Sequence, residues 1–255
     1  MSHTFTFLEE KGVIVNKDHY KDLKTTSLID KIQDWEALDR DFLITFRHAK
    51  HYRRFKAIKI QDKEIYIKKY LMNLYEAEKE WQNIQLLWQK GFPTSIPVFL
   101  YIDKDFAIVG TERVPGITIP TLLENNAELI MDFIKELAIF LARFHKEGFC
   151  HQDCYLNHFY YDPSTKSMRI IDVSRVLFKP TFLIYYFAKD LSQLRFSFWK
   201  YFEENFAEAW KTFIEEYEKH YKKANTIENF LIEFKFRKIL RRAMRKGQRW
   251  SKNGF

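Results

Sequence analysis

The sequence predicts an α+β protein built from two lobes, a smaller sheet lobe followed by a larger helical one. Short apolar runs separated by turn residues occupy roughly the first 115 positions, whereas later positions show mostly helical spacing of apolar residues. A Val-Pro-Gly tripeptide at 114–116 separates the two patterns. We therefore expect an N-terminal lobe over residues 1–112 and a C-terminal lobe over residues 113–255.

Three hairpins and two helices account for the N-terminal lobe. The hairpins pair residues 4–8 with 13–15, 55–60 with 65–69, and 98–102 with 106–111. One helix is expected over residues 28–38. A longer helix over residues 75–90 carries an apolar stripe and ends at Gly91. Together these elements predict a small antiparallel sheet with one long helix.

The C-terminal lobe begins with an amphipathic helix over residues 129–146, which ends at Gly148. A loop follows, and then two short strands over residues 159–161 and 168–173. From about residue 182 onward the pattern is helical and rich in aromatic residues. The chain contains 25 Phe and 14 Tyr, and large aromatic side chains commonly fill an interior. We expect these helices to pack around such a core.

Composition excludes several classes of protein. Hydrophobic residues make up 46% of the chain and charged residues 30%, a balance typical of folded globular proteins. The two cysteines, Cys150 and Cys154, supply neither a disulfide framework nor a four-ligand zinc site, which favours a reducing compartment. No signal peptide is visible and no apolar run is long enough to span a bilayer. We therefore expect a soluble, cytoplasmic protein.

Positive charge is concentrated at the C-terminus. The net charge is +8, and residues 234–255 contain nine basic residues and no acidic one. As a helix, this segment would place basic rows beside Phe236, Ile239 and Leu240, a pattern typical of helices that lie on anionic membranes. The same helix could instead pack its apolar side on the lobe and leave its charge in solvent. A nucleic-acid partner would also explain the charge, but we regard it as the less favoured one.

The segment most informative about function follows the helix that ends at Gly148. Its loop presents His-x-Asp at 151–153, and a potential metal ligand, His158, lies five residues beyond Asp153. Fourteen residues after His158, an apolar strand ends in Asp172. Phosphoryl transfer needs one carboxylate at the attacking hydroxyl and another that holds Mg²⁺ against the nucleotide phosphates. The spacing is that of a kinase catalytic loop and its metal-binding aspartate.

Two residues of the N-terminal lobe fit the same chemistry. Lys68 follows the apolar triplet at 65–67, as does the strand lysine that contacts nucleotide phosphates in kinases. Glu80, on the next helix, is placed to hold that lysine by an ion pair. Lys69 is the alternative, since strand alternation lets only one of the two lysines point toward the nucleotide. The four elements in this order predict a bilobal protein-kinase-like fold in which both aspartates and the lysine serve one magnesium nucleotide.

The catalytic loop and its flanking motifs resemble those of a known family. His-Gln-Asp-Cys-Tyr-Leu-Asn-His-Phe at 151–159 resembles the His-Arg-Asp-Cys-Tyr-x-x-His-Phe signature of the lipopolysaccharide core heptose kinase family. Ile-Asp-Val-Ser-Arg at 171–175 is similar to its Ile-Asp-Leu-His-Arg, and Lys-Asp-Leu at 189–191 to its Arg-Asp-Leu. Glu-Trp at 80–81 and Gly-Phe-Pro-Thr at 91–94 also match family elements. The likeness covers roughly residues 40–220.

The resemblance implies ATP and Mg²⁺ as cofactors and assigns roles in the catalytic loop. Asp153 would orient and deprotonate a sugar hydroxyl, and Asp172 would coordinate Mg²⁺. His158 stands where protein kinases carry Asn, so it would contact either phosphate or the cation. Asp190 would brace the catalytic loop through backbone amides, and His151 would pack beneath the metal loop.

The connection between the lobes would bind adenine. There the carbonyl group of Glu112 and the amide group of Val114 are the expected partners of the base.

Two departures from protein kinases bear on the substrate. A glycine-rich phosphate loop is missing, and a basic segment at 47–54 stands in its place, either covering phosphates directly or lying in solvent. Gln152 replaces the usual Arg, and only 18 positions separate Asp172 from Asp190. So short a segment leaves little room for a regulated activation loop or a peptide platform. We expect a small or sugar acceptor and constitutive activity.

The leading hypothesis is an ATP-dependent kinase that phosphorylates a heptose hydroxyl of the lipopolysaccharide inner core at the cytoplasmic face of the inner membrane. The lipopolysaccharide core sugar is then the substrate, and the basic C-terminal helix could hold the enzyme peripherally on the anionic membrane. A second hypothesis changes the acceptor to Kdo, another heptose or an aminoglycoside-like molecule. A third is a non-catalytic kinase-fold module that binds membrane or nucleic acid.

Overall fold

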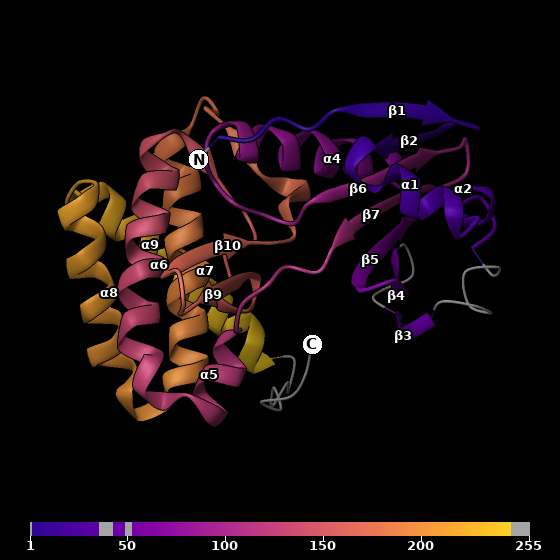
Figure 1. Ribbon diagram of the computed structural model, residues 1–255. Coiled ribbons are helices and arrows are strands. Elements are labelled where there is room, and N and C mark those ends of the chain that lie inside the picture. Colours follow the sequence, from indigo (N-terminus) through magenta and orange to yellow (C-terminus); the bar gives the residue numbers. More distant parts are fainter. Residues whose placement is uncertain (1, 36–42, 49–52, 246–255) are drawn as a thin grey trace. The chain divides into compact units, whose positions relative to one another are not determined.

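The structure is a computed structural model that describes residues 2–35, 43–48 and 53–245. The chain divides into two compact units, Met1–Val114 and Pro115–Phe255. The first is built on an antiparallel sheet and the second is mainly helical (Figure 1). This arrangement is the α+β class that the sequence predicts.

In the described part of the first unit, a single sheet contains seven strands in the order β1-β2-β6-β7-β5-β4-β3. The strands are β1 (Phe7–Glu10), β2 (Val13–Asn16), β3 (Leu43–His48), β4 (Arg53–Ile60), β5 (Lys63–Tyr70), β6 (Pro97–Ile102) and β7 (Ala107–Glu112). Neighbouring strands are antiparallel throughout. All three predicted hairpins are confirmed, as β1–β2, β4–β5 and β6–β7.

The sheet is covered on both faces. On one face, helix α4 (Leu74–Gln89) packs Ala77 and Trp81 against Tyr70. On the other, α1 (Lys17–Thr25) and α2 (Leu28–Lys31) bury Leu23 and Leu28 on the strands. Since alternate residues of a strand point to opposite faces, β5 contributes to both cores. Lys68 and Lys69 therefore point in opposite directions.

Three features of this unit differ from the sequence prediction. Helix α1 was not predicted, because only His19 and Leu23 of its nine residues are buried and the apolar period is correspondingly weak. Its start is marked by Asn16, whose side chain accepts a hydrogen bond from the Asp18 amide. The basic segment 47–54 is not one loop, because its two ends belong to β3 and β4. The helix predicted over residues 28–38 ends at Lys31 as the short α2, and turns follow it as far as residue 35. Residues 36–38, and the middle of the basic segment at 49–52, lie outside the described residues.

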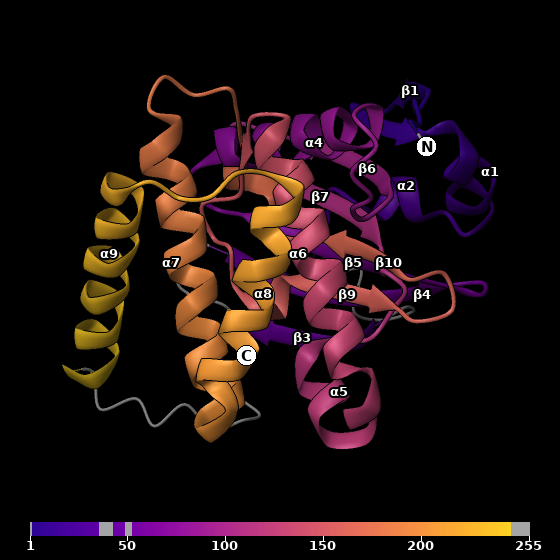
Figure 2. The same ribbon diagram turned by 90° about the vertical axis from the view of Figure 1, so that its left-hand side faces the viewer.

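Four long helices dominate the second unit as far as residue 245. They are α6 (Ile130–Lys146), α7 (Leu183–Phe202), α8 (Phe206–His220) and α9 (Thr226–Arg245), and a shorter α5 (Ile119–Asn125) precedes them. Helix α6 packs against α8, and α7 packs against both α8 and α9, as Figure 2 shows. The predicted helix 129–146 is confirmed as α6. No helix among the described residues is both long enough and apolar enough to cross a bilayer.

Short strands and turns connect α6 to α7. Strands β9 (Phe159–Asp162) and β10 (Ser167–Ile170) form a hairpin, and β8 (Phe149–Cys150) pairs with β11 (Leu177–Phe178). The predicted strand 168–173 ends early, because a 3₁₀ turn (Val173–Arg175) follows Asp172. Asp172 itself has a left-handed backbone, with φ 56° and ψ 54°, a conformation that Asp tolerates better than most residues. A second 3₁₀ turn, Leu156–His158, leads from the His-x-Asp loop into β9.

Candidate active site

In the first unit, Lys68 and Glu80 form the ion pair that the sequence predicts. Lys68 Nζ lies 2.5 Å from Glu80 Oε1, and both side chains are largely buried. Glu80 is fixed from a second direction by a hydrogen bond from the Tyr70 hydroxyl to Oε2. Lys69 lies on the opposite face of β5, with Nζ 4.0 Å from the centre of the Phe106 ring. Of the two lysines, therefore, Lys68 is the one paired with a carboxylate on α4.

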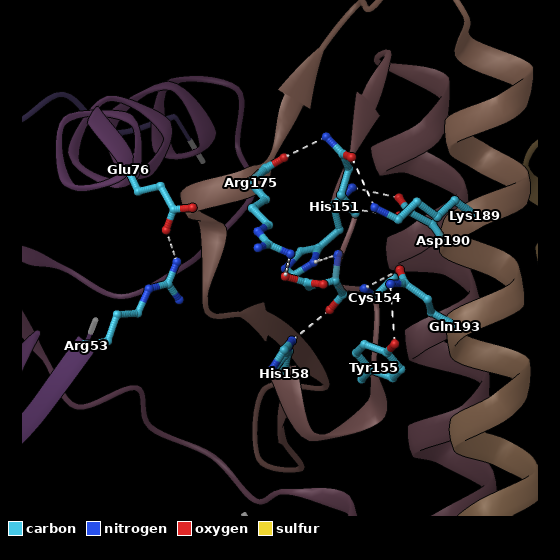
Figure 3. A network of polar contacts seen from close by, with 12 residues as sticks. Arg53, Glu76, His151, Cys154, Tyr155, His158, Arg175, Lys189, Asp190 and Gln193 are labelled. Atoms are coloured by element: carbon cyan, nitrogen blue, oxygen red, sulfur yellow. Dashed lines mark hydrogen bonds and ion pairs between the residues drawn. The ribbon is translucent and has the colours of Figure 1, made fainter. Parts of the chain in front are cut away.

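Arg53 is a residue of this group that sequence reasoning missed. Its segment is expected from the sequence either to cover phosphates or to lie in solvent, whereas Arg53 begins β4 and forms an ion pair with Glu76 of α4 (Figure 3). Its guanidinium carbon also lies 5.1 Å from the centre of the Tyr70 ring. The strand pairing of Arg53 with Tyr70 in β5 brings these residues together. A strand that starts within a basic run leaves no local signal of this contact.

The two residues expected to bind adenine lie at the end of the first unit. Glu112 is the last residue of β7, and its amide donates to the Ile96 carbonyl at 2.9 Å. Its side chain turns toward Lys63 Nζ, 3.2 Å from Oε1, and toward the buried His19. Val114 is nearly fully buried. The structure thus places both residues without testing their predicted role.

In the second unit, Asp190 holds the catalytic loop. It is completely buried on α7, and its two carboxylate oxygens accept hydrogen bonds from the amides of His151 (2.6 Å) and Gln152 (2.7 Å). His145 Nε2 lies 3.3 Å from the same carboxylate, and His145 Nδ1 is 2.7 Å from the Tyr217 hydroxyl. Gln152 has a φ of 67°, so the loop turns sharply at the residue that Asp190 holds. The brace therefore runs from α8 through α6 and α7 to the loop.

His151 joins the catalytic loop to the strand before Asp172. Its Nδ1 accepts a hydrogen bond from the Asp153 amide at 3.2 Å, so its proton is on Nε2. That Nε2 donates to the Ile171 carbonyl at 3.0 Å. The ring is fully buried. His151 thus fixes Asp153 relative to the residue that precedes Asp172.

His158 adopts the tautomer in which Nε2 can bind a cation. Its Nδ1 donates to the Asp153 carbonyl at 2.7 Å, which leaves the lone pair on Nε2. Burial lowers the pKa of His158, the neighbouring His151 lowers it further, and the Asp172 carboxylate raises it. The net direction is downward, which favours the neutral ring. Asp172 is close enough for this interaction, so a carboxylate and a neutral imidazole share one neighbourhood.

Asp172 and His158 suit a cation that is bound partly by the protein and partly by the nucleotide phosphates. Within the described ranges, no cluster of three or more His, Cys, Asp and Glu side chains could hold a metal. Mg²⁺ usually keeps several waters and takes one or two protein ligands together with phosphates. Asp172 meets that requirement, while the imidazole of His158 is a weaker ligand for a hard cation. The donor set fits nucleotide-bound Mg²⁺ and not a closed protein cage.

The side chain of Asp153 contacts a residue for which the sequence analysis gave no role. Arg175 Nη1 lies 3.2 Å from Asp153 Oδ2. Gln152 and Lys189 lie beside this pair, and Figure 3 shows Arg175, Lys189 and Asp190 around the loop. The available signal was the Arg that closes the Ile-Asp-Val-Ser-Arg run at 171–175. Both cysteines near the loop are buried free thiols, and burial raises the pKa of each.

Comparison with known proteins identifies a family whose model matches most of the chain and solved structures of similar fold. The sequence model of the Lipopolysaccharide kinase (Kdo/WaaP) family matches residues 31–217. A solved structure titled "WaaP in complex with acyl carrier protein" has a TM-score of 0.62 and 16% identity, covering 92% of this chain and 98% of that chain. The crystal structure of an aminoglycoside-3'-phosphotransferase of type VIII has a TM-score of 0.62 and 17% identity, covering 77% of this chain and 91% of that one. No curated protein matches significantly. The predicted kinase-like fold is confirmed by these two structures, which at such identities show the fold alone.

Proposed function

The chain belongs to the lipopolysaccharide kinase (Kdo/WaaP) family, and from this membership we propose that it transfers the γ-phosphoryl group of ATP to a hydroxyl of an inner-core heptose. The family and the kinase-like fold support phosphoryl transfer to a lipopolysaccharide core sugar. Heptose is supported more narrowly, by the Cys-Tyr-x-x-His-Phe run at 154–159. The observation that carries the proposal is that Asp153 projects from a loop whose two preceding amides, of His151 and Gln152, both donate to the buried Asp190.

Asp153 is the proposed base. Among the described residues its Oδ2 contacts Arg175 and its Oδ1 accepts no hydrogen bond, so Oδ1 is available to an acceptor hydroxyl. In the proposed step Oδ1 takes the hydroxyl proton while the hydroxyl oxygen bonds to the γ-phosphorus. The bond from the γ-phosphorus to the bridging oxygen breaks, and ADP leaves with that electron pair.

The remaining residues bind the nucleotide in this proposal. Asp172, with Nε2 of His158, would hold Mg²⁺, which when bound neutralises charge on the phosphates. Lys68, kept in place by Glu80, would contact the phosphates, since a buried ammonium paired at 2.5 Å presents its remaining protons in fixed directions. Glu112 and Val114 would bind adenine through the backbone.

A transfer assay with an Asp153 variant tests this function. The full chain is incubated with Mg-ATP and dephosphorylated core oligosaccharide, and phosphate incorporation is followed by mass spectrometry. We expect transfer by the wild-type protein, and a loss of at least about 100-fold in Asp153→Ala, because a positioned base contributes about that much or more. Asp162→Asn is the matched control, because Asp162 ends β9 away from the catalytic loop and its carboxylate accepts hydrogen bonds from Ser164 in the following turn. Wild-type turnover in Asp153→Ala would show that the base is assigned wrongly.

The same assay identifies which molecule accepts the phosphate. Tandem mass spectrometry of the product places the new phosphate on heptose if the proposal is correct. Phosphate on Kdo would keep the kinase chemistry and overturn heptose specificity. No transfer to core oligosaccharide, together with transfer to an aminoglycoside, would overturn the substrate class.

We also propose a peripheral location on the cytoplasmic face of the inner membrane. Helix α9 packs inward through Ile232 and Phe236, the latter 4.5 Å from the Arg195 guanidinium of α7. Its apolar side thus rests on the second unit, as one of the sequence alternatives expects. The opposite side carries an exposed stripe at helical spacing, made of Ile227, Phe230, Phe234, Lys238, Arg241 and Arg245. Aromatic and basic side chains along one exposed row suit an anionic lipid surface.

A further inference from the structure

Arg175 contacts only one of the two carboxylate oxygens of Asp153. Arg175 Nη1 takes Oδ2 at 3.2 Å, and the two side chains are 47% and 26% exposed. The terminal torsion of an aspartate is soft and roughly two-fold, so an unheld carboxylate samples many orientations. A single charge-assisted hydrogen bond to one oxygen removes much of this freedom. It also decides which oxygen meets the acceptor.

Arg175 is itself held by a chain of two side chains. Its carbonyl oxygen accepts a hydrogen bond from Gln152 Nε2 at 3.1 Å. Gln152 Oε1 in turn accepts from Lys189 Nζ at 3.1 Å. Lys189 belongs to α7, beside Asp190, so the chain starts from the helix that braces the catalytic loop. Burial lowers the pKa of Lys189, while Asp153 and Asp190 raise it.

Gln152 is rigid enough to transmit this restraint. Its amide donates to Asp190 Oδ1 at 2.7 Å, and its φ of 67° is a conformation that L residues adopt only when the surroundings impose it. Both ends of its side-chain amide are used, one by Lys189 and the other by the Arg175 carbonyl. Lys189, Gln152 and Arg175 therefore form a clamp that connects α7, the catalytic loop and the 3₁₀ turn after Asp172.

We propose that Arg175, held by Gln152 and Lys189, is a positioning residue that fixes the Asp153 carboxylate for phosphoryl transfer. The inference rests on the proposed function and adds a restraint on its base. Every member of the clamp is an unmodified side chain, so the aspartate is aligned without a phosphorylated activation segment. The short span between Asp172 and Asp190 is consistent with this built-in alignment.

Variants of the clamp test the inference through kinetics. Arg175→Met should lower kcat by about 30-fold or more and change the KM for ATP and the KM for the acceptor by less than about three-fold. This result is expected because an interaction needed for the transition state is lost while ground-state binding is kept. Arg175→Lys should recover part of that loss. Gln152→Ala and Lys189→Met should each lower kcat by about five-fold. The double variant should be no worse than the poorer single one, since both act through the same contact.

Lys200→Met is the matched control for Lys189→Met. Lys200 lies on the same helix about three turns beyond Lys189, burial also lowers its pKa, and its Nζ lies 4.8 Å from the centre of the Tyr201 ring. It should leave kcat unchanged. Wild-type kcat in Arg175→Met, or multiplicative losses in the Gln152–Lys189 double variant, would overturn the inference while transfer by the wild-type protein upholds the proposed function.

The orientation of the Asp153 side chain can be measured without knowing which acceptor the enzyme uses. Crystal structures of the wild-type protein and of Arg175→Met should show Asp153 in one orientation in the first and in several in the second. An unchanged Asp153 side chain in the variant would overturn the inference without any activity assay. Circular dichroism and thermal unfolding of each variant verify that it is folded.

Discussion

Asp190 illustrates at the scale of one residue how a buried charge organises the site. It accepts two backbone hydrogen bonds from the catalytic loop and lies beside His145, in a completely buried position. A buried carboxylate is tolerated only where donors replace its hydration. Here the donors are the amides of His151 and Gln152, the two residues that precede Asp153. The charge thus fixes the backbone from which the proposed base projects.

Removing this carboxylate should unfold the protein more easily. Asp190→Ala leaves two buried amides without acceptors, and we expect the free energy of unfolding to fall by about 3 kcal/mol. Urea denaturation followed by circular dichroism measures the change. Asp132→Ala is the control, because Asp132 makes a surface pair with Lys166 and should cost less than about 1 kcal/mol. Equal stability of the two variants would show that Asp190 is not a brace.

At the scale of elements, the sheet of the first unit depends on close contacts between neighbouring strands. Phe99 of β6 is paired with Gly110 of β7, and the Phe99 ring lies directly over the glycine. A side chain at position 110 would overlap this ring. The glycine is therefore a packing requirement, set by a cross-strand partner and not by a backbone conformation.

A pair of glycine variants distinguishes these two requirements. Gly110→Ala should lower the free energy of unfolding by about 2 kcal/mol or more, because its Cβ would enter the space of the Phe99 ring. Gly91→Ala should cost about 1 kcal/mol, since its φ of 76° strains an alanine while nothing lies within 4 Å of the added carbon. Chemical denaturation measures both values. If Gly110→Ala proved the milder change, the packing argument would be wrong.

At the scale of the whole molecule, positive charge is concentrated at the C-terminus, and α9 carries exposed apolar side chains beside it. Outside residues 234–255 the basic and acidic residues nearly balance, at 33 against 34. Within the described part of that segment, Lys238, Arg241 and Arg245 continue the stripe begun by Phe230 and Phe234. Exposed aromatic residues of this size are costly in water unless a partner covers them. An anionic lipid surface would satisfy both features.

Vesicle binding tests the lipid surface. The full chain should sediment with vesicles of phosphatidylcholine and phosphatidylglycerol and release in high salt, because surface charge attraction is screened. Arg241→Glu with Arg245→Glu should abolish binding, and Phe230→Ser with Phe234→Ser should weaken it. Lys211→Glu with Lys223→Glu is the charge-matched control at exposed positions outside the stripe. Binding that is equal in all variants would exclude the stripe as the contact surface.

The sequence alone determined the features that depend on neighbouring residues. Alternation, helical spacing and turn residues predicted the three hairpins, α4, α6 and the helical second unit. The His-x-Asp loop and Asp172 were found because their motif is contiguous or follows a strand end. Helix α1 was missed because two buried residues in nine leave little periodic signal.

Tertiary structure decided what depends on partners far apart in the chain. It paired Lys68, and not Lys69, with Glu80, joined Arg53 to Glu76, and joined Arg175 to Asp153. The last pair is separated by 22 residues. Contacts of this kind arise when strands pair and helices pack, and hydrophobic burial drives that packing without regard to sequence distance. Spacing along the chain therefore indicates which chemistry is present, while the packed fold selects the side chains that meet.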